Sequence, residues 1–261
     1  SAASDVYKRQ SLLSSSLERL QPDIVLLLGD RYETHAAATT ALLMNIPVAH
    51  IHGGEITEGA VDEQIRHSIT KMSYLHFCST ESYRKRVIEM GEDLSRVFNS
   101  GAPGIDNIKN LKLLTKNELE KVLNWKLSNV SALFTYHPET LKKYSIGNEL
   151  DIVLTDLQAF NFNILFTYAN ADLGGRIINQ KIEKFCKLNP LKYKVVKNLG
   201  QVKYLSAMKH VDLLIGNSSS GIIEAASFGK PVVNIGDRQK GRIRGENVID
   251  CNLNSFQNSI K

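Results

Sequence analysis

Short runs of consecutive apolar residues alternate along the chain with longer segments in which apolar residues recur every three or four positions. The runs are typical of strands buried on both faces of a parallel sheet, and the spaced pattern is typical of amphipathic helices. In the first half the expected strands are residues 24–28, 48–52 and 74–78. The expected helices there are residues 11–20, 35–44, the later part of 57–72, and 81–90. This alternation predicts βαβ units on a right-handed parallel sheet.

The second half of the chain repeats the same alternation after a Gly/Pro loop at residues 99–104 and a polar helix expected at 111–123. Its expected strands are residues 131–136, 163–168, 195–196, 211–215 and 231–235. Its expected helices are residues 144–160, 176–186, 202–209 and 222–228, and another helix begins near the C-terminus. The pattern therefore predicts an α/β protein with two Rossmann-like domains, residues 11–110 and 111–261, that face a cleft. Residues 1–10 show no convincing pattern and contribute nothing to this prediction.

Composition agrees with an ordinary globular protein of one large or two ordinary domains, since the 261 residues are 43% hydrophobic and 23% charged. No apolar run approaches the roughly 20 residues of a membrane span, and no signal peptide is visible. The net charge of +5, with lysines in both halves, favours small anionic ligands over nucleic acid. The three cysteines lack the paired spacing of a metal site, which indicates reduced thiols and a cytoplasmic location: Cys78, Cys186 and Cys251.

The clearest sign of a ligand lies in residues 216–248, where an expected strand stops and three serines precede an expected helix. Hydroxyls and free backbone N–H groups at the positive end of a helix dipole suit a phosphate or diphosphate group. Basic residues follow the next strand, on the side where α/β sheets bind ligands: Arg238, Lys240, Arg242 and Arg244. From the residues alone, a capping serine run followed by solvated basic residues fits equally well.

Polar side chains also follow the first two expected strands: Asp30, Arg31, His50, His52 and Glu55. Carboxylates, imidazoles and a guanidinium at adjacent strand ends are suitable groups for proton transfer. Two simpler interpretations stay open, namely Asp30 as a helix cap and His50 as a core histidine. The two histidines have a spacing that zinc uses, but no third ligand stands in a recognisable motif, so we expect no metal.

Several motifs then occur together and in one order: Gly29-Asp30-Arg31-Tyr32-Glu33, His50-Ile51-His52-Gly53-Gly54-Glu55, Ile65-Arg66-His67-Ser68-Ile69-Thr70-Lys71, His137-Pro138, Gly216-Asn217-Ser218-Ser219 and Glu246-Asn247-Val248. They resemble the UDP-N-acetylglucosamine 2-epimerases, most of all the hydrolysing branch of sialic and related nonulosonic acid biosynthesis. The resemblance runs from about Pro22 to the C-terminus. It implies a two-domain fold like that of the GT-B glycosyltransferases, with a nucleotide sugar in the cleft.

The resemblance also implies a reaction. A base removes the C2 proton of the sugar while the C1–O bond to UDP breaks, which gives a 2-acetamidoglycal. Water then adds with inversion at C2 and releases N-acetylmannosamine or a related 2-acetamido sugar. The reaction needs no metal or redox cofactor, its partner is a UDP-sugar, and the family suggests a homo-oligomer, a dimer or a tetramer.

By position, the resemblance assigns the chemistry to Asp30, His52, Glu55 and Asp62. Asp30 and Asp62 match carboxylates proposed for proton transfer. Several hydrolysing relatives have a glutamate where this chain has His52, and a histidine there suits either a base near neutral pH or a substrate contact. Glu55 is the second candidate for the C2 base.

The remaining positions are expected to bind the substrate. His137 matches a histidine at the UDP phosphate, and Ser218 and Ser219 match the pair that binds the diphosphate. Glu224 matches the carboxylate at the ribose hydroxyls, and Arg238 matches another nucleotide-site residue. Four further substrate-binding candidates come from the first half: Arg31, His50, Arg66 and His67. Without the resemblance, the Asp62/Arg66 pair indicates only a solvated helix face.

Three other functions stay open. A non-hydrolysing epimerase keeps UDP on the sugar, but that branch has an HVEAGLR-like motif where residues 50–55 stand. A nucleotide-sugar-binding module without turnover is suggested because the family's opening strand and Gly-rich turn have no counterpart before Ile24, nor its closing helix after residue 261. We therefore expect an incomplete N-terminal domain. The two histidine motifs argue against a retaining glycosyltransferase, and the sequence does not separate UDP from GDP or one 2-acetamido sugar from another.

Overall fold

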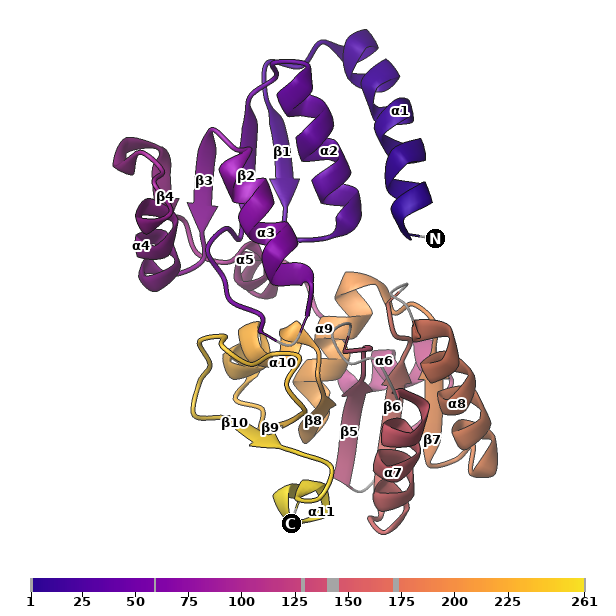
Figure 1. Ribbon diagram of the computed structural model, residues 1–261. Helices are drawn as coiled ribbons and strands as arrows, with labels where there is room; N and C mark the ends of the chain where they lie inside the picture. The colour runs from indigo at the N-terminus through magenta and orange to yellow at the C-terminus, as the bar shows by residue number, and fades with distance from the viewer. Residues whose placement is uncertain (1, 59, 128–129, 140–145, 171–173, 261) are drawn as a thin grey trace. The chain divides into compact units, whose positions relative to one another are not determined.

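The computed structural model describes residues 2–58, 60–127, 130–139, 146–170 and 174–260, which form two compact units (Figure 1). The first unit consists of Ser1–Thr57 and Val61–Pro103, and the second consists of Glu58–Ala60 and Gly104–Lys261. In each unit a parallel sheet packs against helices, as the alternating pattern predicts.

The first unit has a four-stranded sheet in the order β1-β2-β3-β4, and all of its strand pairs are parallel. The strands are β1 (Val25–Leu28), β2 (Val48–Ile51), β3 (Leu75–Cys78) and β4 (Val97–Asn99). The helices are α1 (Ala2–Leu20), α2 (Tyr32–Leu43), α3 (Asp62–Lys71), α4 (Glu81–Glu89) and the short η1 (Leu94–Arg96). The strands end side by side, so the residues that follow β1 and β2 share one edge of the sheet.

Two apolar clusters hold this unit together. One joins α1, α2 and α3 to β1 and β2 through Leu17, Leu27, Ala38, Ala41, Val48 and Ile69. The other joins α4 to β3 and β4 through Cys78, Tyr83, Val87 and Val97. Helix α1 begins at Ala2, so it includes most of residues 1–10, whose sequence showed no convincing pattern.

The second unit has a six-stranded parallel sheet in the order β10-β9-β8-β5-β6-β7. The strands are β5 (Val130–Thr135), β6 (Phe162–Thr167), β7 (Tyr193–Val196), β8 (Leu213–Gly216), β9 (Val232–Ile235) and β10 (Val248–Cys251). The chain moves outward from β5 in one direction and then returns to its other side at β8. This is the Rossmann strand order, and ligands bind such sheets at the carboxyl ends of the two strands where the order reverses.

Helices cover both faces of the second sheet. The helices of this unit are α5 (Pro103–Asn110), α6 (Lys116–Leu123), α7 (Ile146–Gln158), α8 (Gly175–Leu188), α9 (Gly200–His210), α10 (Ser219–Ile223), η2 (Ala225–Phe228) and α11 (Phe256–Ile260). Alternate residues of β5 divide between two cores: Phe134 packs with the α7 and α8 side, and Leu133 packs with the α6 and α9 side. This two-sided burial explains why β5 reads as a continuous apolar run.

Several expected elements differ from the structure. The helix expected at 111–123 begins only at Lys116, because Thr115 and Glu118 form a capping box in which each side chain bonds the backbone N–H of the other residue. Pro103 instead opens α5, a position that suits proline because the first helical N–H has no partner. The helix expected at 222–228 is the shorter α10 followed by a 3₁₀ turn. Residues 144–145 of the helix expected at 144–160 lie outside the described residues.

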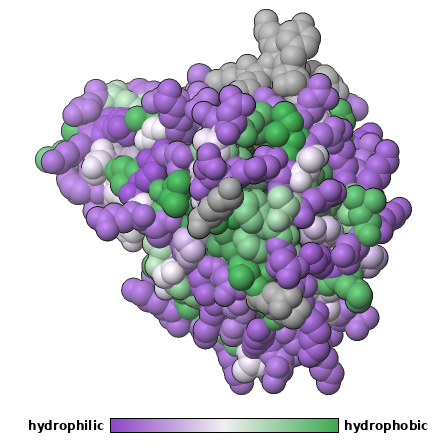
Figure 2. Space-filling view, turned by 90° about the horizontal axis from the view of Figure 1, so that it is seen from below, coloured by the Kyte–Doolittle hydropathy of each residue, from purple (hydrophilic) through white to green (hydrophobic). Residues whose placement is uncertain are grey.

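The surface and the cysteines agree with the composition. The face seen from below is largely hydrophilic, with apolar residues gathered in a few patches (Figure 2). All three cysteines are free and buried. No helix in the described part of the chain is both long enough and apolar enough to cross a membrane.

Candidate functional site

The reversal point of the second sheet is built from neutral hydrogen-bonding groups. Thr135 at the end of β5 lies opposite Gly216 at the end of β8. A Cβ on Gly216 would lie 1.9 Å from the Thr135 carbonyl oxygen, so only glycine fits this close approach. The buried Asn217 then ties the two loops together: its Oδ1 accepts the His137 N–H at 2.7 Å, and its Nδ2 donates to the His137 carbonyl at 2.9 Å.

The serine turn follows directly. Ser218 caps α10, with its Oγ accepting the Ser220 N–H at 3.4 Å and lying 3.0 Å from the Ser220 Oγ. Tyr204 comes from α9, and its hydroxyl lies 2.5 Å from the Ser220 Oγ. Three hydroxyl groups from two helices therefore form one chain at this edge of the sheet.

These groups line a cavity of about 460 Å³ in the second unit, together with His137, Lys197 and Gln201. None of the described residues that line it carries a carboxylate. The Asn170 N–H donates to the His137 Nδ1 at 3.1 Å, which places the ring proton on Nε2 when the imidazole is neutral. Hydroxyl, imidazole and ammonium donors in a lining of this kind suit an anionic group.

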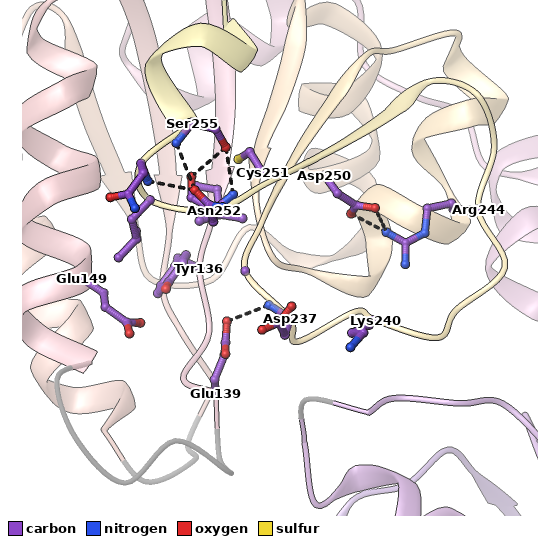
Figure 3. A pocket seen from close by; sticks show the side chains of 14 residues that line it. Tyr136, Glu139, Glu149, Asp237, Lys240, Arg244, Asp250, Cys251, Asn252 and Ser255 are labelled. Carbon is purple, nitrogen blue, oxygen red and sulfur yellow. Dashed lines mark hydrogen bonds and ion pairs between the residues drawn. The ribbon is translucent and has the colours of Figure 1, made fainter.

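A larger cavity of about 660 Å³ lies beyond the ends of β9 and β10 and has the opposite character (Figure 3). Its charged lining consists of Glu139, Glu149, Asp237, Lys240, Arg244 and Asp250. Arg244 is already ion-paired with Asp250. Burial, assisted by the two glutamates, holds the pKa of Tyr136 above its usual range. Since carboxylates outnumber cations here, a diphosphate is favoured in the smaller cavity.

Two further predicted nucleotide residues lie at the same edge of the second unit. Glu224 follows α10, and a Cβ on Gly104 of α5 would lie 2.7 Å from its Oε1, so the carboxylate packs closely on that helix. Arg238 is buried and donates from Nη1 to the Asn217 carbonyl at 3.2 Å. Gln239 donates to the same carbonyl at 2.9 Å. Arg238 therefore supports the turn that carries Ser218.

In the first unit, Asp30 and Arg66 form an ion pair at the end of β1. Arg66 lies on α3 and is completely buried, and its Nη1 also donates to the Glu55 carbonyl at 2.7 Å and to the Thr57 Oγ1 at 3.0 Å. The interpretation of Asp62 and Arg66 as a solvated helix face is therefore wrong for Arg66. The helix-cap interpretation of Asp30 is also wrong, because Arg31 is the N-cap of α2 and no side chain caps that helix.

A second acid–base pair follows β2. The His52 Nδ1 lies 2.6 Å from the Glu55 Oε1, and Ser79 donates to the same oxygen at 2.8 Å. Glu55 is 2% exposed, so its carboxylate is held inside the unit. His52 has φ of 68°, a left-handed conformation that non-glycine residues adopt mainly at constrained sites. The Glu55 contact occupies Nδ1, so Nε2 is the ring nitrogen outside this pair.

His50 takes a different position from its neighbour. It is completely buried, with Nε2 2.8 Å from the Gly29 carbonyl and Nδ1 3.2 Å from the Thr70 Oγ1. Burial lowers its pKa to about 4, so it stays neutral near pH 7. The structure thus favours the core-histidine interpretation over a direct substrate contact. Through Gly29, His50 fixes the turn that carries Asp30.

The remaining candidates lie on helices of the first unit. Asp62 is the first residue of α3. His67, one turn later, is partly exposed, with Nε2 3.8 Å from the Glu63 Oε1, and burial lowers its pKa. Arg31 lies 3.6 Å from Glu33 and stacks over the Tyr32 ring. Within the described residues, no group of three or more histidine, cysteine or carboxylate side chains is arranged to hold a metal ion.

Sequence reasoning missed three residues that complete these clusters: Ser79, Tyr204 and Ser220. Ser79 precedes the N-cap Thr80, so its position at a strand end was a usable signal. Ser220 stood in the serine run, but its partner on α9 gave no signal because Tyr204 fits the apolar helical pattern there.

Comparison with known proteins adds the family. Residues 8–258 match the family model described as UDP-N-acetylglucosamine 2-epimerase. The chain is 47% identical over 252 residues to GDP/UDP-N,N'-diacetylbacillosamine 2-epimerase (hydrolyzing) of Campylobacter jejuni. The aligned residues cover 96% of this chain and 66% of the relative. It is 40% identical over 232 residues to UDP-N,N'-diacetylbacillosamine 2-epimerase (hydrolyzing) of Legionella pneumophila, over 89% of this chain and 61% of the relative. The chain thus spans less than two thirds of these relatives.

Solved structures give the same fold. The UDP-GlcNAc 2-epimerase of Neisseria meningitidis bound to UDP-GlcNAc has a TM-score of 0.82 at 21% identity, over 100% of this chain and 73% of that chain. The Methanocaldococcus jannaschii enzyme in complex with UDP-GlcNAc and UDP has a TM-score of 0.79 at 18% identity, over 100% and 74%. The predicted α/β fold with Rossmann-like units is confirmed. The chain belongs to the UDP-N-acetylglucosamine 2-epimerase family.

Proposed function

We propose that the protein is a hydrolysing 2-epimerase that converts a nucleotide-linked 2-acetamido sugar into UDP and the free C2-epimeric sugar. The observation that carries the proposal is the link through Arg66 between two acid–base pairs. One of its terminal nitrogens pairs with Asp30, and the other bonds the carbonyl of Glu55, whose carboxylate holds His52. Reversing the configuration at C2 requires proton removal and proton return on opposite faces of the sugar, and hence two such groups.

In the first step, a base takes the C2 proton, the C2–H electrons form the C1=C2 bond, and the C1–O electrons leave with UDP. In the second step, a proton returns to C2 from the other face while the oxygen of water bonds to C1 and loses its own proton. His52 is suited to move a proton because Glu55 fixes its ring and leaves Nε2 for the substrate. Asp30 and Asp62 are the partner carboxylates, and Glu55 acts through His52.

The departing diphosphate is assigned to the smaller cavity of the second unit. Ser218, His137 and Lys197 line that cavity and supply donors there. Ser219 is the first residue of α10, directly after Ser218, but is not among the residues that line the cavity. Stabilisation of the leaving group by donors already in position lowers the barrier for C1–O cleavage. Glu224, a carboxylate at this edge, is assigned to the ribose hydroxyls, to which it can accept hydrogen bonds.

The substrate class is a nucleoside diphosphate linked to a 2-acetamido hexose. N-acetylglucosamine and N,N'-diacetylbacillosamine are the sugars in the relatives' names, with UDP or GDP as carrier. The free, buried thiols fit a reducing, cytoplasmic compartment, and we assign the protein a homo-oligomeric state on the family resemblance.

The test is incubation of the whole protein in heavy water with UDP-N-acetylglucosamine and, separately, with UDP-N,N'-diacetylbacillosamine, followed by NMR. Free UDP and a C2-epimeric sugar carrying deuterium at C2 are expected from one of the two. A UDP-linked epimer as the lasting product would assign the non-hydrolysing reaction instead. UDP binding without any sugar product would assign a binding module.

A further inference from the structure

Tyr204 connects the core of the second unit to its smaller cavity. Its ring packs against the apolar cluster formed by α6, α9 and the sheet, while its hydroxyl reaches the Ser220 Oγ at 2.5 Å. Burial raises the pKa of this phenol, and hydrogen bonds with Ser220, Thr135 and Ser218 act in the opposite direction. The phenol therefore keeps its proton at neutral pH and has a hydrogen to donate.

Either oxygen of each hydroxyl pair can be the donor, and one of the two directions leaves a hydrogen free at the cavity end of the chain. Each hydroxyl donates one hydrogen and accepts up to two. If Tyr204 donates to the Ser220 Oγ, the Ser220 hydrogen is free for the Ser218 Oγ at 3.0 Å. The Ser218 Oγ also accepts the Ser220 N–H, so both bonds from Ser220 arrive at its acceptor side. The Ser218 hydrogen is then left to point outward into the cavity.

The Tyr204 hydroxyl has a second partner on the sheet. The Tyr204 hydroxyl also has a side-chain hydrogen bond with Thr135. The Thr135 Oγ1 lies in turn 2.7 Å from the Thr167 Oγ1 on the neighbouring strand. The chain of hydroxyls thus begins on the rigid sheet, passes through α9 and ends at the start of α10. Hydrogen bonds in such a chain polarise one another, which strengthens the last donor.

We propose that Tyr204 is a positioning residue that, through Ser220, turns the Ser218 hydroxyl into a donor aimed at the diphosphate of the nucleotide sugar. This inference rests on the proposed function, since it needs a diphosphate at Ser218. If Tyr204 served only to pack its ring, removing its hydroxyl would not change the affinity for a charged ligand more than the affinity for a neutral one. The two roles differ in which ligands lose affinity when the hydroxyl is removed.

The experiment is calorimetry of UDP and of uridine with the wild-type protein, Tyr204→Phe, Ser220→Ala and the double variant. Hydrogen bonds to a charged group are strong enough that losing the oriented donor should weaken UDP binding about tenfold in each single variant. Uridine affinity should stay unchanged, because uridine has no phosphate. The double variant should bind UDP about as well as either single variant, since both substitutions break the same chain.

Tyr193→Phe is the matched control, because it removes a phenol hydroxyl from the core of the same unit, where the ring packs against Phe166 and Phe185. It should leave both affinities unchanged. Unaltered UDP binding by Tyr204→Phe, an equal loss for uridine, or additive losses in the double variant would each overturn the inference. If Tyr204→Phe does not fold, Ser220→Ala decides by the same UDP-to-uridine comparison. A wild-type protein that binds no UDP would overturn the proposed function itself, and the inference with it.

Discussion

The carboxyl edges of the two sheets have the same topological role but different side chains. In the first unit the edge carries ionisable groups in buried or half-buried pairs, Asp30 with Arg66 and His52 with Glu55. In the second unit the corresponding edge carries neutral groups, such as the Asn217 amide and the hydroxyl chain through Tyr204. One edge is suited to exchanging protons, and the other is suited to holding an anion.

The physical reason lies in what each task requires of a buried group. Proton transfer needs groups that exist in two protonation states, and a buried charge is tolerated only where a partner compensates it. Anion binding needs donors that are already oriented, and a neutral hydroxyl costs little to bury when its oxygen accepts a bond. Substitutions in the first unit should therefore change turnover and not UDP binding, and substitutions of the hydroxyl groups in the second unit should change UDP binding.

Asp30→Asn should give the largest effect. It keeps the shape but removes the carboxylate, and loss of an acid–base group lowers turnover by about 10³-fold. UDP affinity should stay unchanged, because the proposed diphosphate donors belong to the second unit. Turnover is measured by the release of UDP, and binding by calorimetry. Asp93→Asn, at an exposed cap of η1, is the control; unchanged turnover in Asp30→Asn would remove Asp30 from the mechanism.

Arg66→Met should show that the same pair also stabilises the first unit. Removing one partner leaves the Asp30 charge, the Glu55 carbonyl and the Thr57 hydroxyl without their donor, so the free energy of unfolding should fall by about 3–5 kcal/mol. Hydrogen exchange at the amides of β1 and β2 reports on this unit by itself. Arg96→Met, which removes an exposed pair with Asp93, should lower the free energy of unfolding far less, because water screens such a pair. Equal losses in the two variants would contradict the structural role of Arg66.

Acid should destabilise the first unit through His50. Its pKa is about 4 in the folded protein, below the ordinary value near 6.5, so the unfolded chain binds more protons between these values. The stability is fully present above about pH 6.5 and is lost as the pH falls toward 4, by about 3 kcal/mol. Burial lowers the pKa of His76 too, which adds loss in the same direction. Urea titrations from pH 7 to 4 should give a flatter profile for His50→Gln; an identical profile would exclude His50 as the cause.

The sequence predicted the strands better than it predicted which side chains contact one another. Runs such as β5 are visible because both of their faces are buried, whereas β10 has exposed Ile249 and Asp250 and leaves no run. Residues at strand ends were predicted as site candidates because the topology of a parallel sheet brings them together. The pairing of Arg66 with Asp30 was not predicted, although Arg66 was expected to bind substrate, and Tyr204 was no candidate. Arg66 is 36 residues from Asp30, and Tyr204 is 16 residues from Ser220. Such contacts depend on how a helix packs, which the period of its apolar residues does not determine.

Glu224 is the exception to the comparison, because it places a carboxylate at the neutral edge, and its substitution should give the smallest effect. If it accepts hydrogen bonds from the ribose, Glu224→Gln should weaken UDP and uridine equally, by about tenfold. That pattern differs from Tyr204→Phe, which should affect UDP alone. If Glu224 instead lay against the diphosphate, removing its charge would relieve repulsion and tighten UDP binding while uridine stayed unchanged. Glu149→Gln, in the larger cavity, is the control, and a change in its UDP affinity would move the nucleotide to that cavity.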